Sequence, residues 1–125
     1  MLCIKIINKE KDMYSLILNW DLSEKPKEIF QRLREYIAHE SWKRYENKEG
    51  LVQKVWYSNE ETGQFGAIYL WETKKAMEEE IRTMYRIKSM TGIDPTITRL
   101  NVEAIQEGKH RIENLTNMGL AWKKE

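Results

Sequence analysis

The segment 65–71, Phe-Gly-Ala-Ile-Tyr-Leu-Trp, constrains the fold most, because it predicts a strand that is apolar on both faces. Side chains alternate along a strand, so one face carries Phe65, Ala67, Tyr69 and Trp71, and the other carries Gly66, Ile68 and Leu70. A sheet with helices on one face and water on the other shows polar residues on its second face instead. The second face therefore needs an apolar cover. We expect a second copy of the chain to supply it, in a homodimer joined through the sheets; the alternative is a cover from the N-terminal run or the C-terminal tail.

Hydrophobic patterning along the chain predicts the order strand, helix, strand, strand, helix, strand. The strands are predicted at 13–20, 51–58, 65–71 and 96–105, and the helices at 26–45 and 73–92. The turn cluster 59–63 joins the two middle strands as a hairpin. This order is that of the ferredoxin-like βαββαβ sandwich, an α+β fold in which both helices cover one face of a four-stranded antiparallel sheet.

Cap residues predict where the helices begin and end. Ser23 is the expected N-cap of the first helix, Thr73 is that of the second, and Gly92 ends the second. Helical spacing predicts that the second helix turns one stripe inward, made of Met77, Glu80, Ile81, Met84 and Lys88 and flanked by Tyr85 and Ile87.

The length of 125 residues corresponds to one domain, 1–125. Within it we expect a ferredoxin-like core at 13–106, an N-terminal extension at 1–12 and a C-terminal tail at 107–125. The apolar run 2–7 could form a further strand. In the tail, Leu115, Met118 and Trp122 are candidates for docking onto the core.

Charge and composition argue against several classes of protein. Lys and Arg number 21 and Asp and Glu number 20, a net charge of +1, whereas nucleic-acid binding calls for a surplus of positive charge. The single cysteine, Cys3, excludes an internal disulfide, and with only two histidines we expect no metal site. Because no apolar run reaches membrane-spanning length and the N-terminal run is too short for a signal peptide, we expect a cytoplasmic protein with no membrane partner.

Two neighbouring segments resemble a known family. Gly50 to Ser58, Gly-Leu-Val-Gln-Lys-Val-Trp-Tyr-Ser, followed by Gly66 to Trp71, Gly-Ala-Ile-Tyr-Leu-Trp, is similar to the YdhR-like mono-oxygenases. Arg-Ile-Lys at 86–88 and Gly-Ile at 92–93 fit the same alignment, which covers about residues 13–105. The wider antibiotic-biosynthesis monooxygenases look similar at 71–77, Trp-Glu-Thr-Lys-Lys-Ala-Met.

The resemblance implies a dimeric α/β barrel, with a pocket in each subunit between sheet and helices. It also implies oxygenation without a cofactor, so we expect none. Many of the wider relatives carry a histidine nine residues after the tryptophan, where this chain has Glu80. That departure argues against chemistry that depends on histidine.

Oxygenation without metal or flavin needs an electron-rich substrate, such as a phenol or quinol, that can itself reduce O₂. The protein removes a proton, holds the resulting anion and excludes water. If the resemblance holds, Tyr69 and Trp71 form one wall of the pocket, and Met77, Glu80 and Met84 form the opposite wall.

Glu80 is the candidate base, because burial on the apolar stripe of its helix would strengthen it as a proton acceptor. The alternative, favoured by the rarity of buried carboxylates, is that Glu80 points to solvent with Glu78 and Glu79.

Arg99, which shares a strand face with Asn101, is the candidate for stabilising an oxyanion; the alternative is an exposed edge or an interface ion pair. Trp56 is a further candidate for binding a small aromatic ligand, although a tryptophan on such a strand more often belongs to the core or an interface.

Two other functions remain open. The same fold and dimer would suit a non-catalytic protein that binds a small hydrophobic ligand, as a sensor or stress protein. An RNA-recognition domain shares the element order, and segment 64–71 faintly resembles its base-stacking motif. However, the leading basic residue is missing, the stacking position is Ala67, and the net charge is only +1.

Overall fold

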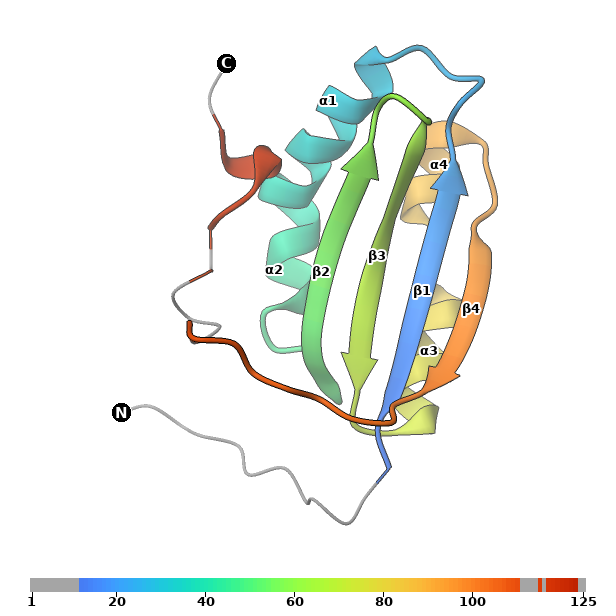
Figure 1. The fold of residues 1–125 in the computed structure, drawn as a ribbon. Coiled ribbons are helices and arrows are strands. Elements are labelled where there is room, and N and C mark those ends of the chain that lie inside the picture. Colours follow the sequence, from blue (N-terminus) through green and yellow to red (C-terminus); the bar gives the residue numbers. More distant parts are fainter. Residues whose placement is uncertain (1–11, 111–114, 116, 124–125) are drawn as a thin grey trace.

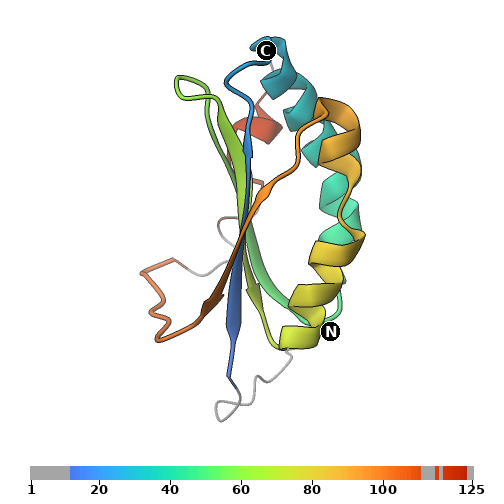
Figure 2. The ribbon, with the colours of Figure 1, turned by 90° about the vertical axis from the view of Figure 1, so that its right-hand side faces the viewer.

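Four antiparallel strands form one sheet, and the helices α1, α3 and α4 lie on one side of it (Figure 1, Figure 2). The computed structural model describes residues 12–110, 115 and 117–123. The strands, in the spatial order β2-β3-β1-β4, are β1 (Tyr14–Asp21), β2 (Leu51–Asn59), β3 (Gln64–Trp71) and β4 (Thr96–Asn101). The helical elements are α1 (Glu28–Tyr36), the π-helix η1 (Ile37–Ser41), α2 (Trp42–Tyr45), α3 (Lys74–Thr83), α4 (Arg86–Thr91) and the 3-10 helix η3 (Leu120–Trp122). The ferredoxin-like fold is therefore confirmed.

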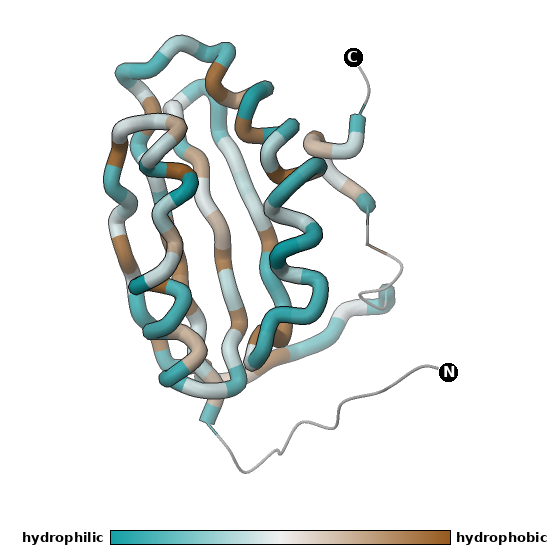
Figure 3. Tube along the Cα trace, turned by 180° about the vertical axis from the view of Figure 1, so that it is seen from behind, coloured by the Kyte–Doolittle hydropathy of each residue, from teal (hydrophilic) through white to brown (hydrophobic). Residues whose placement is uncertain are grey.

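The strand register determines which side chains face the helices. Leu16 of β1 lies opposite Tyr69 of β3, and Lys54 of β2 lies opposite Tyr69 from the other side. These positions, with every second residue along the same strands, form the inner face of the sheet, which is the face that the helices cover. The buried core there comprises Leu16, Leu18, Trp20, Phe65, Ala67, Tyr69 and Trp71 from the strands and Phe30, Leu33, Ile37 and Met77 from the helices. Seen from the helix side, hydrophilic positions predominate along the helices, with apolar positions interspersed (Figure 3).

The first helical region begins later than predicted. α1 starts at Glu28, its N-cap is Lys27, and no side chain caps it. The prediction that Ser23 is the cap is wrong, because the Ser23 N–H donates to Asp21 Oδ1 at 3.0 Å in a turn before the helix. From Glu28 the chain continues through the five-residue π-helix η1 into α2, so the helical region still reaches Tyr45.

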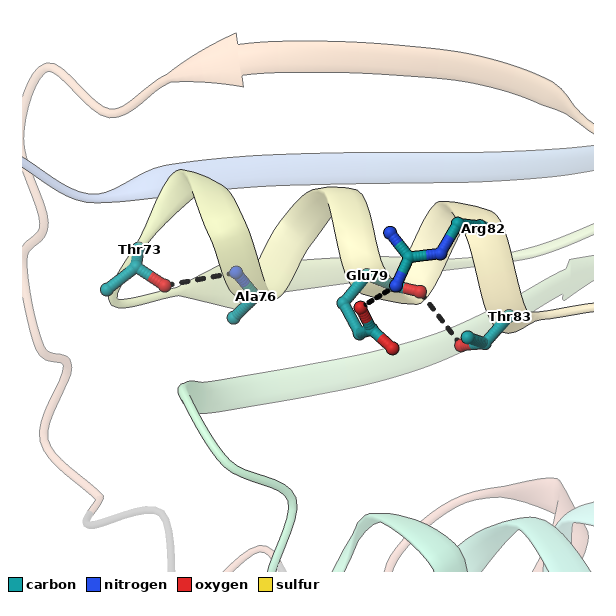
Figure 4. Close-up of polar contacts among 5 residues, drawn as sticks. All are labelled: Thr73, Ala76, Glu79, Arg82 and Thr83. Carbon is teal, nitrogen blue, oxygen red and sulfur yellow. Dashed lines mark hydrogen bonds and ion pairs between the residues drawn. The ribbon is translucent and has the colours of Figure 1, made fainter.

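The second predicted helix is two helices. Thr73 caps α3 by accepting a hydrogen bond from the Ala76 N–H at 3.0 Å, as predicted (Figure 4). The backbone is then extended at Met84, with ψ of 105°. After this break α4 ends at Gly92, whose φ of +76° suits glycine.

The break changes which side chains of the second half turn inward. Ile87 is buried, whereas Lys88, which the unbroken stripe places inward, forms an ion pair with Asp94 at 2.8 Å on the surface. The prediction for Lys88 is therefore wrong, because it assumed one continuous helical phase from Thr73 to Gly92.

The second face of the sheet carries large apolar side chains. Val55, Ile68 and Leu100 are 45%, 44% and 44% exposed there. Tyr57 crosses this face over Gly66: a Cβ added at Gly66 would lie 2.5 Å from the Tyr57 hydroxyl.

The last strand ends at Asn101 rather than at the predicted 105. The strand predicted at 2–7 lies outside the described residues, and none of the described helices is long and apolar enough to cross a membrane.

Candidate functional site

A cavity of about 560 Å³ opens at the β2 edge of the sheet, between β2, the α1–α2 region and residues 115 and 117–122. In Figure 1, η3 lies beside α1, next to this edge. The aromatic lining residues are Phe30, Trp42, Trp56, Tyr57, Phe65 and Trp122. The charged lining residues are Arg34 and Lys54. Aliphatic residues include Ile37, Val55, Leu115, Met118 and Leu120. The cavity thus combines flat apolar walls with two cationic side chains.

Three tryptophans from distant parts of the chain meet at this cavity. The Trp42 ring lies 5.8 Å from the Trp56 ring and 5.0 Å from the Trp122 ring, centroid to centroid, and it meets Trp122 edge to face. Such pairs add to the stability that apolar burial gives. Trp122, a predicted docking residue of the tail, does contact the core, and it closes the outer wall of the cavity.

Lys54 occupies an aromatic cage at the inner side of the cavity. Its Nζ lies 3.4 Å from the centroid of the Tyr45 ring, 4.4 Å from that of Trp56 and 4.6 Å from that of Tyr69. Burial lowers the pKa of Lys54 well below its ordinary value; the charge of Glu80 opposes this, and those of Arg44 and Lys48 add to it. The cage therefore holds a lysine that is easier to deprotonate than one in water.

Glu80 lies behind this cage, fully buried at 0% exposure. Its Oε2 accepts hydrogen bonds from the hydroxyls of Tyr45 and, at 2.9 Å, Tyr69. Among the described residues its Oε1 has no hydrogen-bond partner. The expectation that Glu80 points to solvent is wrong, because α3 turns it toward two buried tyrosine hydroxyls.

The two tyrosines stay protonated donors. Burial raises the pKa of Tyr45 far above its ordinary value, and the Glu80 charge raises it further. Burial also raises the pKa of Tyr69, with further contributions from Tyr45 and Glu80. A hydroxyl that keeps its proton can go on donating to the Glu80 carboxylate.

The predicted pocket walls pack more tightly than expected. Tyr69, Trp71 and Met77 are 1%, 0% and 2% exposed, and the Tyr69 and Trp71 rings stack at 5.6 Å. Beside Tyr69 and Met84 there is a void of about 10 Å³, room for about one water. Trp71 and Met77 line neither this void nor the large cavity. The open space lies one strand further out, where Trp56 is.

The structure does not bring Arg99 to the cavity. Its guanidinium pairs with both carboxylate oxygens of Glu78 on α3, at 2.8 to 3.2 Å, on the exposed β4 edge of the sheet. Arg99 therefore links the outermost strand to α3. Among the described residues no three His, Cys, Asp or Glu side chains are grouped so that they could hold a metal ion.

Sequence reasoning missed Lys54 and Trp42 as site residues. The sequence does contain a feature that could have identified Lys54: it occupies an inward position of β2, two residues before Trp56. A charged residue at an apolar position of a strand is uncommon unless it has partners. Trp42 has no such signal, since its position depends on how η1 turns the helix.

Comparison with known proteins identifies a family match over most of the chain. The family described as "Putative mono-oxygenase ydhR" matches residues 17–114. No curated protein matches the sequence.

Solved structures of other proteins share the fold. A protein of unknown function from Nitrosomonas europaea is 8% identical, with a TM-score of 0.59 over 79% of this chain and 97% of that one. A monooxygenase from Streptomyces coelicolor, solved with the ligand nanaomycin D, is 7% identical, with a TM-score of 0.55 over 82% of this chain and 96% of that one. A dimeric ferredoxin-like protein from an uncultured marine organism is 14% identical, with a TM-score of 0.52 over 76% and 98%.

Proposed function

The chain belongs to the ydhR mono-oxygenase family, and from this premise we propose that it oxygenates a small electron-rich aromatic substrate, a phenol or quinol, without a resident cofactor. The observation that carries the proposal is the cavity at the β2 edge, whose walls include Trp42 and Trp56 and whose inner side holds the caged amine of Lys54. Flat apolar walls with few polar groups are typical of sites for aromatic ligands.

The proposed reaction takes its electrons from the substrate. The phenol loses its proton, and the phenolate transfers an electron to O₂. The two radicals then combine, forming a C–O bond to a peroxide. Breaking the O–O bond and losing the ring hydrogen release water and leave a quinone. A phenol and O₂ thus give a quinone and water, and each product receives one of the two atoms of O₂.

Each predicted site residue has a place in this proposal. Trp56 is the platform for the substrate ring, Tyr69 is one ring of the lysine cage, and Met84 lines the small void beside it. Glu80 is a positioning residue rather than one that touches substrate, because neither its carboxylate nor the two tyrosines that donate to it line the cavity. Trp71 and Met77 keep β3 and α3 in place as core residues. Arg99 fixes the β4 edge to α3 through Glu78.

We also propose that two copies of the chain associate through the second face of the sheet. Val55, Ile68 and Leu100 present exposed apolar surface there. Large apolar side chains gathered on one face are typical of interaction sites. The marine relative is described as a dimeric ferredoxin-like protein.

One observation favours a second candidate, a non-catalytic homodimer that binds a small hydrophobic ligand. Glu80 and Tyr69 are packed into the core, away from the open cavity. Oxygen uptake separates the two functions. We would screen phenols such as 1-naphthol in an oxygen electrode, with catalase to detect released peroxide. Consumption of one O₂ per quinone formed supports oxygenation, whereas saturable binding without oxygen uptake supports the binding protein.

A further inference from the structure

Lys54 is placed where a ligand in the cavity would meet it. It lines the large cavity, and it also lines the small void on the other side, between the cavity and the core. Its register partner is Tyr69, so its side chain projects from the inner face of β2. Whatever enters from the β2 edge therefore meets the Lys54 side chain before it meets Glu80.

The cage leaves Lys54 Nζ without an anionic contact. Among the described ion pairs, each within 4.0 Å, none involves Lys54. Arg34, the other cation of the cavity, is already paired with Glu60 at 3.2 Å. Of the two cations, Lys54 is thus the one that lacks a carboxylate partner.

Charged and titratable groups face Lys54 from every element packed around it. α3 contributes Glu80, α2 contributes Tyr45 and Arg44, the loop before β2 contributes Lys48, and β3 contributes Tyr69. The hydroxyls of the two tyrosines donate hydrogen bonds to Glu80. Lys54 therefore contacts the faces of their rings. Aromatic ring faces attract a cation but cannot accept its proton as a carboxylate does.

We propose that Lys54 Nζ accepts the phenolic proton of the ligand and then holds the phenolate, so that the cavity selects acidic phenols. In this step the ligand O–H bond breaks, its electron pair stays on oxygen, and an N–H bond forms on a neutral Lys54. The ammonium that results is stabilised by the three rings, by Glu80 behind it and by the phenolate in front. The proposal rests on the proposed function for its substrate class, but it concerns binding and ionisation, which can be measured without turnover.

The test uses 4-nitrophenol, whose phenolate has its own visible absorbance and whose electron-poor ring does not reduce O₂. The variants are K54M, which removes the base at similar length, and K54R, which keeps a permanent charge. The matched control is K43M, which makes the same exchange at an exposed position of α2. Circular dichroism shows whether each variant folds. If K54M does not fold, the comparison of K54R with wild type across pH tests the proposal.

We expect wild type and K43M to bind the yellow phenolate at a pH where free 4-nitrophenol is mostly neutral. K54M should bind it roughly ten- to a hundredfold more weakly, as expected for losing a hydrogen bond between charged groups. At a pH above the pKa of both free groups the wild-type affinity should fall about tenfold per pH unit, because the complex takes up a proton. K54R, which carries its proton already, should bind equally well across that range.

Each other outcome overturns the role of Lys54. These are no binding by wild type, binding of neutral 4-nitrophenol, equal binding by K54M and wild type, and the same pH dependence in K54R as in wild type. Oxygen uptake with 1-naphthol tests the mono-oxygenase proposal, and its result does not depend on the 4-nitrophenol binding test. If ionisation depends on Lys54 but no phenol is oxygenated, the Lys54 site stands and the mono-oxygenase proposal fails. If K54M oxygenates 1-naphthol as fast as wild type, the proposed role of Lys54 fails and the mono-oxygenase proposal stands.

Discussion

The Tyr69 hydroxyl on β3 donates a hydrogen bond to the Glu80 carboxylate on α3 at 2.9 Å, in a part of the core where both residues are fully buried. This bond joins the sheet to the helix layer directly behind the Lys54 cage. Two buried tyrosine hydroxyls thus hold the Glu80 carboxylate in place. The Glu80 charge raises the pKa of Lys54, against the larger effect of burial, which lowers it.

Replacing Glu80 by glutamine should abolish or strongly reduce turnover while the protein stays folded. Glutamine fills the same space and still accepts from the tyrosines, but the negative charge that raises the Lys54 pKa is gone. The pH at which activity rises should therefore move to lower pH, a shift that a structural role alone would not produce. The measurement is a pH–rate profile of oxygen uptake, with E79Q on the exposed side of α3 as control. Unchanged turnover in E80Q would remove Glu80 from the mechanism.

The pKa of Lys54 also makes stability depend on pH. Because burial lowers this pKa in the folded state, the unfolded chain binds more protons between the lowered pKa and about 10.4. The free energy of unfolding of wild type minus that of K54M should therefore rise with pH over this range, up to about pH 10. Tyr45 and Tyr69, whose raised pKa values lower stability at higher pH, are present in both proteins. Urea titrations at several pH values give this difference; a constant difference would mean that Lys54 is not buried as described.

Replacing Trp122 by alanine should release the outer wall of the cavity. The edge-to-face contact with Trp42 is lost, and such a pair contributes about 0.5–1.5 kcal/mol beyond area burial. Residues 115 and 117–122, which line this wall, lie beyond the family match at 17–114. We expect weaker 4-nitrophenol binding together with a loss of stability of at least that size. Y85A removes an exposed aromatic residue outside the cavity and serves as the control; equal binding by W122A and Y85A would exclude the tail from the site.

Placing a charge at Ile68 should separate the two subunits. This side chain is 44% exposed at the centre of the second sheet face, beside Val55. A glutamate in an apolar interface is costly to desolvate. Sedimentation velocity should show wild type and the surface control Y85E as dimers and I68E as a monomer. A monomeric wild type would contradict the dimer.

The sheet itself gives a steric prediction at Gly66. An alanine Cβ there would lie 2.2 Å from the Leu18 carbonyl oxygen and 2.5 Å from the Tyr57 hydroxyl. Overpacking of this kind costs about 1–3 kcal/mol. Chemical denaturation should show that loss for G66A and little change for G108A, where no atom lies within 4 Å of the new Cβ. Similar stabilities for the two variants would mean that the strands separate easily at this point.

The sequence was sufficient to predict the fold because its strongest patterns are local. Alternation in 65–71 gave the inner face of β3, and Thr73 and Gly92 marked helix ends that the structure confirms. The break at Met84 was not predictable from spacing, since apolar residues continue on both sides of it. The cavity depends on contacts between Trp42, Trp56 and Trp122, which are far apart in the chain, and no local pattern encodes them. Glu80 was identified by its place on an apolar stripe, but its tyrosine partners come from α2 and β3 and required the structure.

Oxygenation in this cavity is tested by oxidising 1-naphthol under ¹⁸O₂ and analysing the product by mass spectrometry. We predict 1,4-naphthoquinone carrying one ¹⁸O atom, formed by wild type and K43M and lost in W56A, whose ring platform is gone. Quinone formation at the same rate without enzyme or with W56A, or no ¹⁸O in the product, would contradict oxygenation in this cavity.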